Sequence, residues 1–141
     1  MCFFKKKIEP ETTLPKSNEI ITLTELATML HSKYQEASIH LSDSTYLLCD
    51  YDDVALFLAQ DQTNKYGYSL EDYDCDDFAY RLMGQFSIPD WSNLCLGIIW
   101  TATHAFNLFI SEDREIFFIE PQNDTISENL FSNSEVKMIV I

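Results

Sequence analysis

The chain has 141 residues, 46% of them hydrophobic and 13% aromatic, which is enough for one domain whose core needs no disulfide bonds. Its formal net charge of −14 excludes nucleic acid as an expected partner, because phosphates would be repelled over most of the surface. No run of about 18 apolar residues is present and the opening residues lack the order of a secretory signal, so we expect a cytoplasmic protein without membrane contact.

The predicted elements begin after a polar tail. Residues 1–16 are rich in Lys, Glu, Pro and Thr, which predicts a flexible tail, and residues 17–141 form a single domain. Apolar residues at helical spacing predict a first helix over 20–34 and a second over about 51–60. A polar, turn-rich stretch over 61–68 then leads to a third helix.

The third helix is predicted to begin at a cysteine. Asp74 can act as the N-cap, and Cys75 starts an apolar face that continues at helical spacing to Phe86. After this helix the pattern changes to β-branched and aromatic runs separated by turn residues, at 94–100, 104–110, 115–119 and 136–141. The sequence therefore predicts an α+β fold, with N-terminal helices packed on a C-terminal antiparallel sheet.

One histidine and one glutamate of this sheet are predicted to be neighbours. A hairpin turn centred near Glu112 places His104 directly opposite Glu120, where the carboxylate can orient the imidazole. The thiol of Cys75, with an ordinary pKa near ~8.5, would gain thiolate character from the helix N-terminus and from a histidinium. These three residue types are the parts of a cysteine hydrolase, with Cys75 as nucleophile, His104 as base and Glu120 as orienting group.

The same residues resemble a known family. The resemblance is to the papain-like domain at the C-terminus of fungal agglutinins of the Marasmius oreades type, with stand-alone relatives in phages and bacteria, and it covers roughly residues 56–141. It implies a papain-like fold, the catalytic triad just named, and calcium as a candidate cofactor. The sugar-binding β-trefoil of the agglutinin is absent, so we do not expect its lectin activity here. The motifs that carry the resemblance are Asp74-Cys75-Asp76-Asp77-Phe78-Ala79, His104-Ala105-Phe106-Asn107 and Glu120-Pro121-Gln122.

Further polar residues are candidates for support of this site. The glutamine that usually precedes the cysteine of papain-like sequences is missing, so Asn107, Gln122 and Gln62 are candidates for the oxyanion hole or for positioning the triad. An acidic cluster is the candidate calcium site, and a solvated helix start is its alternative explanation. Its members are Asp72, Asp74, Asp76 and Asp77.

The predicted function is a cysteine peptidase or amidase that cleaves a peptide or amide bond through a thioester, with a peptide or protein as substrate. A second hypothesis keeps the fold without catalysis, as an acidic interaction protein that binds a host or virion partner. A third uses the same Cys, His and Glu as zinc ligands. Oligomeric state, substrate identity and the type of bond stay open at this point.

Overall fold

The computed structural model describes residues 14–141. Most of the predicted tail, residues 1–13, therefore lies outside the described residues. The described chain begins against helix α2 (Tyr51–Gln60), because the backbone N–H of Lys16 donates to a carboxylate oxygen of Asp53 at 2.6 Å. No helix of the described residues has the length and apolar character needed to cross a bilayer.

The helices begin where their capping residues predict. Helix α1 (Leu23–Lys33) follows Thr22, whose hydroxyl accepts from the Glu25 N–H at 3.2 Å while the Glu25 carboxylate accepts from the Thr22 N–H at 2.8 Å. The first predicted helix is thus too long at its start, because Ile20–Thr22 forms strand β1 before this cap. Helix α2 has its predicted bounds. A short 3-10 turn η1 (Thr63–Lys65) and helix α3 (Cys75–Phe86) complete the set.

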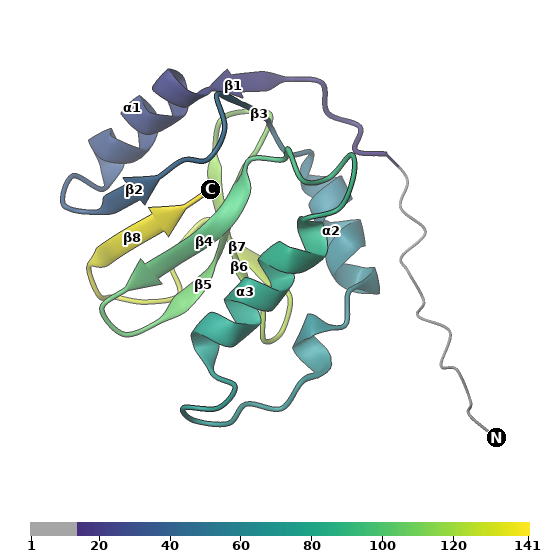
Figure 1. Cartoon of the computed structure of the whole chain (residues 1–141), viewed down its shortest axis with the longest axis vertical. Coiled ribbons are helices and arrows are strands. Elements are labelled where there is room, and N and C mark those ends of the chain that lie inside the picture. The colour runs from purple at the N-terminus through teal and green to yellow at the C-terminus, as the bar shows by residue number, and fades with distance from the viewer. Residues whose placement is uncertain (1–13) are drawn as a thin grey trace.

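A six-stranded sheet forms the centre of the molecule (Figure 1). Its strands lie in the order β2, β8, β4, β5, β6, β7, with bounds Ser38–His40, Val136–Val140, Leu96–Thr101, Ala105–Ile110, Ile116–Glu120 and Thr125–Ser127. Five strands come from the C-terminal half and pair antiparallel; four of them match the predicted runs, and β7 was not predicted. The sheet also takes in β2, which pairs parallel with β8, so the purely antiparallel sheet predicted from the sequence is incomplete. A separate two-stranded sheet joins β1 to β3 (Thr45–Leu47).

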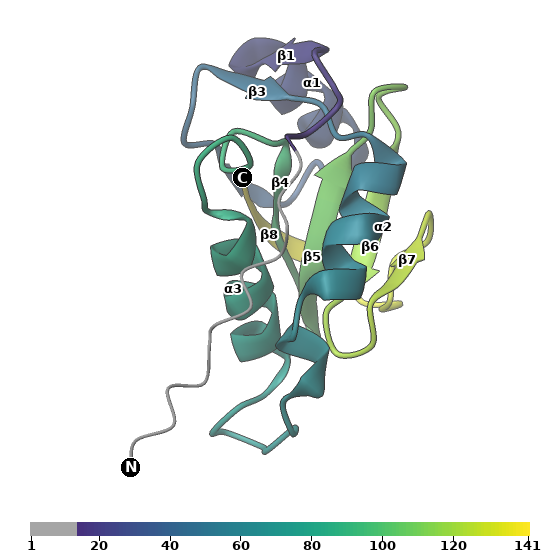
Figure 2. The same ribbon diagram turned by 90° about the vertical axis from the view of Figure 1, so that its right-hand side faces the viewer.

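Strand β5 is buried along its whole length because helices cover both faces of the sheet. Phe106 and Leu108 belong to the hydrophobic cluster that includes α1, and Phe109 belongs to the cluster that includes α2 and α3. Figure 2 shows α2 and α3 beside the central strands and α1 near one end of them. The α+β class predicted from the sequence is confirmed.

Helix α3 is fixed on the sheet by polar and aromatic contacts. The side-chain amide of Asn107 on β5 donates to the carbonyl oxygens of Ala79 at 3.0 Å and Gly97 at 3.1 Å. The rings of Tyr80 and Trp100 lie 5.7 Å apart between their centroids, on α3 and β4 respectively. These contacts place the start of α3 over the end of the sheet that carries the β4–β5 turn.

Candidate functional site

The start of α3 is built by a tight turn and an N-cap. The N–H of Tyr73 donates to the Ser69 carbonyl at 2.7 Å, and Glu71 in this turn has a left-handed φ of 63°. Asp74 then caps the helix: its N–H donates to the Asp77 carboxylate at 3.2 Å. Cys75 is the first helical residue and is partly exposed. A short-range pattern predicted this start because each of these contacts is local in sequence.

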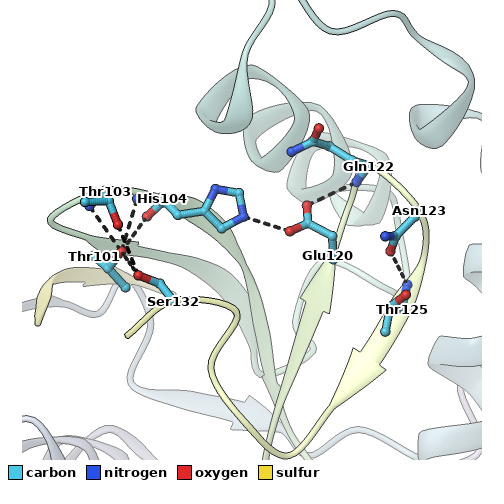
Figure 3. A network of polar contacts seen from close by, with 8 residues as sticks. All are labelled: Thr101, Thr103, His104, Glu120, Gln122, Asn123, Thr125 and Ser132. Carbon is cyan, nitrogen blue, oxygen red and sulfur yellow. Dashed lines mark hydrogen bonds and ion pairs between the residues drawn. The ribbon is translucent and has the colours of Figure 1, made fainter. Parts of the chain in front are cut away.

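His104 is positioned by the turn between β4 and β5. Its backbone N–H donates to the Thr101 hydroxyl at 3.1 Å, and its carbonyl accepts from the Thr101 N–H at 2.8 Å. The imidazole Nε2 lies 2.7 Å from Oε2 of Glu120. Figure 3 shows the two side chains pointing toward each other. The His104 side chain is 20% exposed and that of Glu120 is 13% exposed, so this pair is largely shielded from solvent.

The strand register behind this pair differs from the predicted register. Asn107 lies opposite Ile119 and Leu108 opposite Phe118, so the hairpin turn is centred one residue later than predicted. Continued to the strand ends, this register places Glu120 diagonally from His104 instead of directly opposite. The offset of two residues keeps both side chains on one face, since side chains alternate along a strand, and their length closes the gap.

The structure does not gather all predicted site residues around one point. Asn107 is fully buried and holds α3 against the sheet, with its Oδ1 unpartnered, so its surroundings are those of a packing residue. The backbone N–H of Gln122 donates to Glu120 Oε1 at 3.4 Å, which supports the carboxylate. Gln62 donates to the carbonyls of Gln60 and Asp61 within its own turn.

The predicted metal ligands are only partly assembled. Within the described residues, the only group of three or more His, Cys, Asp and Glu whose ligand atoms lie within 4.8 Å of one another is Asp74, Cys75 and Asp76. The zinc alternative with Cys75, His104 and Glu120 is therefore wrong for this arrangement. A hydrogen bond between the two carboxyl groups lowers the pKa of Asp74 and raises the pKa of Asp76. Two carboxylates beside a thiol fit calcium only in part, because calcium prefers oxygen ligands alone.

Two aromatic rings meet at the surface where α3 packs on β4. Tyr80 is 53% exposed, and Trp100 is partly exposed immediately before the turn that carries His104. Neither residue was predicted from the sequence to belong to the site. The signal for Tyr80 was its position off the apolar face of α3, which leaves a large aromatic ring at the surface.

The fold and this site define an α+β domain with a polar and aromatic surface at one end of its sheet. The model of the ricin-type β-trefoil lectin C-terminal domain matches residues 16–140, and the chain belongs to this family.

Two solved structures show the same fold. One is described as a complex of PSL1a with E64; it is 23% identical, has a TM-score of 0.77, and the match covers 86% of this chain and 50% of that chain. The other is the Polyporus squamosus lectin bound to the human-type influenza-binding epitope Neu5Acα2-6Galβ1-4GlcNAc, at 22% identity and a TM-score of 0.74, covering 86% of this chain and 49% of that chain. This chain thus spans about half the length of both. A comparison with curated proteins gives no significant match.

The family corrects the function that the sequence predicted. We expected a hydrolase of the cysteine peptidase or amidase type, of phage character, acting on a peptide or protein. The family is one of lectin domains, and a solved neighbour is a lectin with bound glycan, so this prediction and its protein-binding alternative are wrong. The resemblance to agglutinins holds at the level of the lectin family. A Cys, His and Glu in favourable order did not define the chemistry of the protein.

Proposed function

We propose that this chain is a carbohydrate-binding domain. Its membership of a lectin family supports this function, and so does the glycan bound to the Polyporus squamosus lectin, a protein of similar fold. Because this chain spans only half of that lectin, the location of a glycan site on this chain is part of the proposal. The observation that carries the location is the contact between the exposed ring of Tyr80 and the partly exposed ring of Trp100, on the strand that leads into the turn carrying His104.

This combination suits a sugar because a sugar has two kinds of surface. The C–H groups of a pyranose ring pack on an aromatic face, and its hydroxyl groups need hydrogen-bond donors and acceptors at fixed positions. Tyr80 and Trp100 supply the first surface. The carboxylate of Glu120 and the imidazole of His104 are already oriented by their mutual contact, so they would lose little side-chain entropy on binding.

The charge of the chain favours a neutral glycan over a sialylated one. The formal charge of the whole chain is −14, and Asp74 and Asp76 lie at the start of the same helix that carries Tyr80. A sialic acid carboxylate would be repelled by this surface, most strongly at low ionic strength. We therefore expect galactose- or N-acetylglucosamine-containing glycans without sialic acid to bind better than Neu5Acα2-6Galβ1-4GlcNAc.

Calorimetric titration with both glycan types tests the proposal, using the Tyr80→Ala variant and a matched control. Tyr68 is 55% exposed, close to the 53% of Tyr80, so Tyr68→Ala removes a similar ring at another place. Tyr80→Ala should weaken binding about two- to tenfold, the size of one aromatic contact, and Tyr68→Ala should not. Absence of binding to any glycan, or equal loss in both variants, contradicts the proposal.

A second proposal concerns Cys75 and rests on the complex of PSL1a with E64. We propose that E64 binds this chain beside Cys75, the partly exposed cysteine at the start of α3, whereas Cys49 and Cys95 are buried. Intact-mass measurement and thermal shift with E64, on wild type and Cys75→Ser, test this. Binding that is unchanged in the variant contradicts it.

Three further expectations from the sequence stay predictions. They are the papain-like architecture, calcium at the acidic start of α3 and the cytoplasmic location. Their support is the motif resemblance, the nearby carboxyl groups of Asp74 and Asp76, and the composition of the chain.

A further inference from the structure

Four hydroxyl groups form a connected cluster at the backbone of His104. They come from Thr101 and Thr103 in the β4–β5 turn and from Ser132 and Ser134 in the segment that precedes β8. Figure 3 shows the side chains of Thr101, Thr103 and Ser132 gathered at the backbone end of the His104 side chain. The protons of these hydroxyl groups can be assigned because each oxygen has a limited number of partners.

Backbone N–H groups fix the direction of the Thr101 hydroxyl. A hydroxyl oxygen has one proton to donate and two acceptor positions. Thr101 Oγ1 accepts from the N–H of Thr103 at 3.3 Å and from the N–H of His104 at 3.1 Å, which fills both acceptor positions. Its proton can reach the His104 carbonyl at 3.2 Å or Ser132 Oγ at 3.0 Å. Because the carbonyl already accepts from the Thr101 N–H at 2.8 Å and Ser132 Oγ is nearer, we assign the proton to Ser132.

The remaining hydroxyl groups follow from this first assignment. Ser132 Oγ accepts from Thr101 and from the Ser134 N–H at 3.0 Å, so its own proton is donated to Thr103 Oγ1 at 3.2 Å. The Thr103 hydroxyl then donates to Ser134 Oγ at 2.8 Å. Hydrogen bonds in such a chain polarise one another. The chain ends at Ser134, whose proton is donated to no acceptor of the described residues.

The chain begins in a buried place and ends at the surface. Thr101 is buried, Ser132 and Ser134 are partly exposed and Thr103 is exposed. The turn that carries two of these hydroxyl groups directly follows Trp100, one of the two rings in the proposed sugar site. A ligand that reaches Ser134 therefore meets a donor that is oriented before binding, which lowers the entropy cost of the contact.

We propose that the Ser134 hydroxyl donates to the acetamido carbonyl of an N-acetylated sugar, and that neutral glycans with this group are the preferred ligands. The assignment rests on the carbohydrate-binding function proposed above. An amide carbonyl oxygen only accepts, so it suits a group left with a proton to donate, whereas a sugar hydroxyl must also place its own proton. A carboxylate also only accepts, but the net charge of −14 and the exposed Glu135 next to Ser134 oppose an anionic ligand.

Calorimetric titration of the full chain with N-acetyllactosamine and with lactose tests the proposal, because the two disaccharides differ only in one acetamido group. Wild type should bind N-acetyllactosamine about two- to tenfold more tightly, the size of one hydrogen bond. Ser134→Ala should abolish this preference, and Ser134→Thr, which keeps a hydroxyl, should retain it. Ser44→Ala, at an exposed position outside the cluster, is the matched control and should keep the wild-type preference.

Three outcomes overturn the proposal. Equal binding of the two disaccharides by wild type, or a preference that survives in Ser134→Ala, removes the acetamido contact while the carbohydrate-binding function stands. Absence of binding to either disaccharide or to any other glycan overturns both proposals together. Ser134 is partly exposed, so Ser134→Ala should fold, and a Tm close to that of wild type shows that it does.

Discussion

The imidazole of His104 and the carboxylate of Glu120 meet at 2.7 Å across two strands that do not place them directly opposite each other. The contact depends on the length of both side chains and on the turn after Glu120, whose Gln122 N–H supports the other carboxylate oxygen. Both side chains are at least four-fifths buried, so loss of one partner leaves a polar group with little access to water.

Glu120→Ala should therefore destabilise the fold by about 1–3 kcal/mol, because the His104 ring nitrogen loses its partner in a shielded place. Urea unfolding followed by circular dichroism measures the change. Glu112→Ala, at an exposed position of the β5–β6 turn, is the control and should change stability by less than about 0.5 kcal/mol. Equal effects of the two substitutions would show that the contact contributes nothing.

Asn107 is expected to be more important for stability than any exposed polar residue. Asn107→Ala removes two hydrogen bonds, to the carbonyls of Ala79 and Gly97, and leaves a cavity at a fully buried position. We expect a loss of about 2–4 kcal/mol in the free energy of unfolding. The exposed Asn129 provides the control, Asn129→Ala. A loss below about 1 kcal/mol would mean that α3 is held by its apolar face alone.

Two glycines should respond to alanine in opposite directions. A Cβ at Gly97 would collide with the backbone carbonyl oxygen of Val140 on the neighbouring strand, whereas a Cβ at Gly84 meets no atom within 4 Å. Gly84→Ala should stabilise α3 by about 0.5–1 kcal/mol through its helix propensity. Gly97→Ala should force β4 and β8 apart and cost more than about 3 kcal/mol. Thermal unfolding of the two variants measures both changes in stability. A Gly97→Ala protein as stable as wild type would contradict the close packing of β4 and β8.

The free energy of unfolding should change with pH because Asp124 has different pKa values in the folded and unfolded chain. Its pKa is raised to about 6 in the fold, so the native state binds this proton more tightly than the unfolded chain. Its contribution is present below the unfolded pKa of about 4 and is lost as pH rises toward about 6. With discounting for solvent screening, Asp124→Asn should gain about 1 kcal/mol over wild type near neutral pH and less near pH ~4.

Urea unfolding in chelator, at several pH values between about 4 and 7, measures this difference. Asp113→Asn, at an exposed position of the β5–β6 turn, is the control. A gap between wild type and Asp124→Asn that is constant over this range would contradict the raised pKa.

Alkylation should distinguish the three cysteines of the described chain. Burial raises the pKa of Cys95 to about 12 and raises that of Cys49 well above its ordinary value, while Cys75 is partly exposed. Because the thiolate is the reactive form, iodoacetamide should modify Cys75 long before the other two in the native protein. Peptide mapping by mass spectrometry measures the order, and unfolding in urea should abolish it. Native modification of Cys95 at the rate of Cys75 would contradict the burial.

Local patterns in the sequence predicted the elements that local interactions define. Asp74 and Asp77 lie three residues apart and cap α3 within one turn, so no distant contact was needed to place the start of this helix. The buried strand β5 was visible as an apolar run interrupted only by Asn107, for the same reason. The α+β class followed from these elements in order.

Apart from the contact between His104 and Glu120, the relationships between distant segments were not predicted. Strand β2 joins the sheet beside β8 although about 100 positions separate the two strands. The three residues of β2 show no pattern of polarity that predicts this pairing. The β5–β6 register was wrong by two residues, because the turn residues near Glu112 fit more than one turn centre. The pairing of Asn64 with Asp124 likewise has no signature in either segment alone.

The sequence by itself determined where the main helices and strands form and which polar residues are unusual, because capping and side-chain periodicity act over a few residues. Only the tertiary structure decided that Asn107 packs, that Glu120 reaches His104 diagonally and that Asp61 and Asp124 share one buried place. The physical reason is that burial and charge repulsion depend on which distant segments the fold brings into contact.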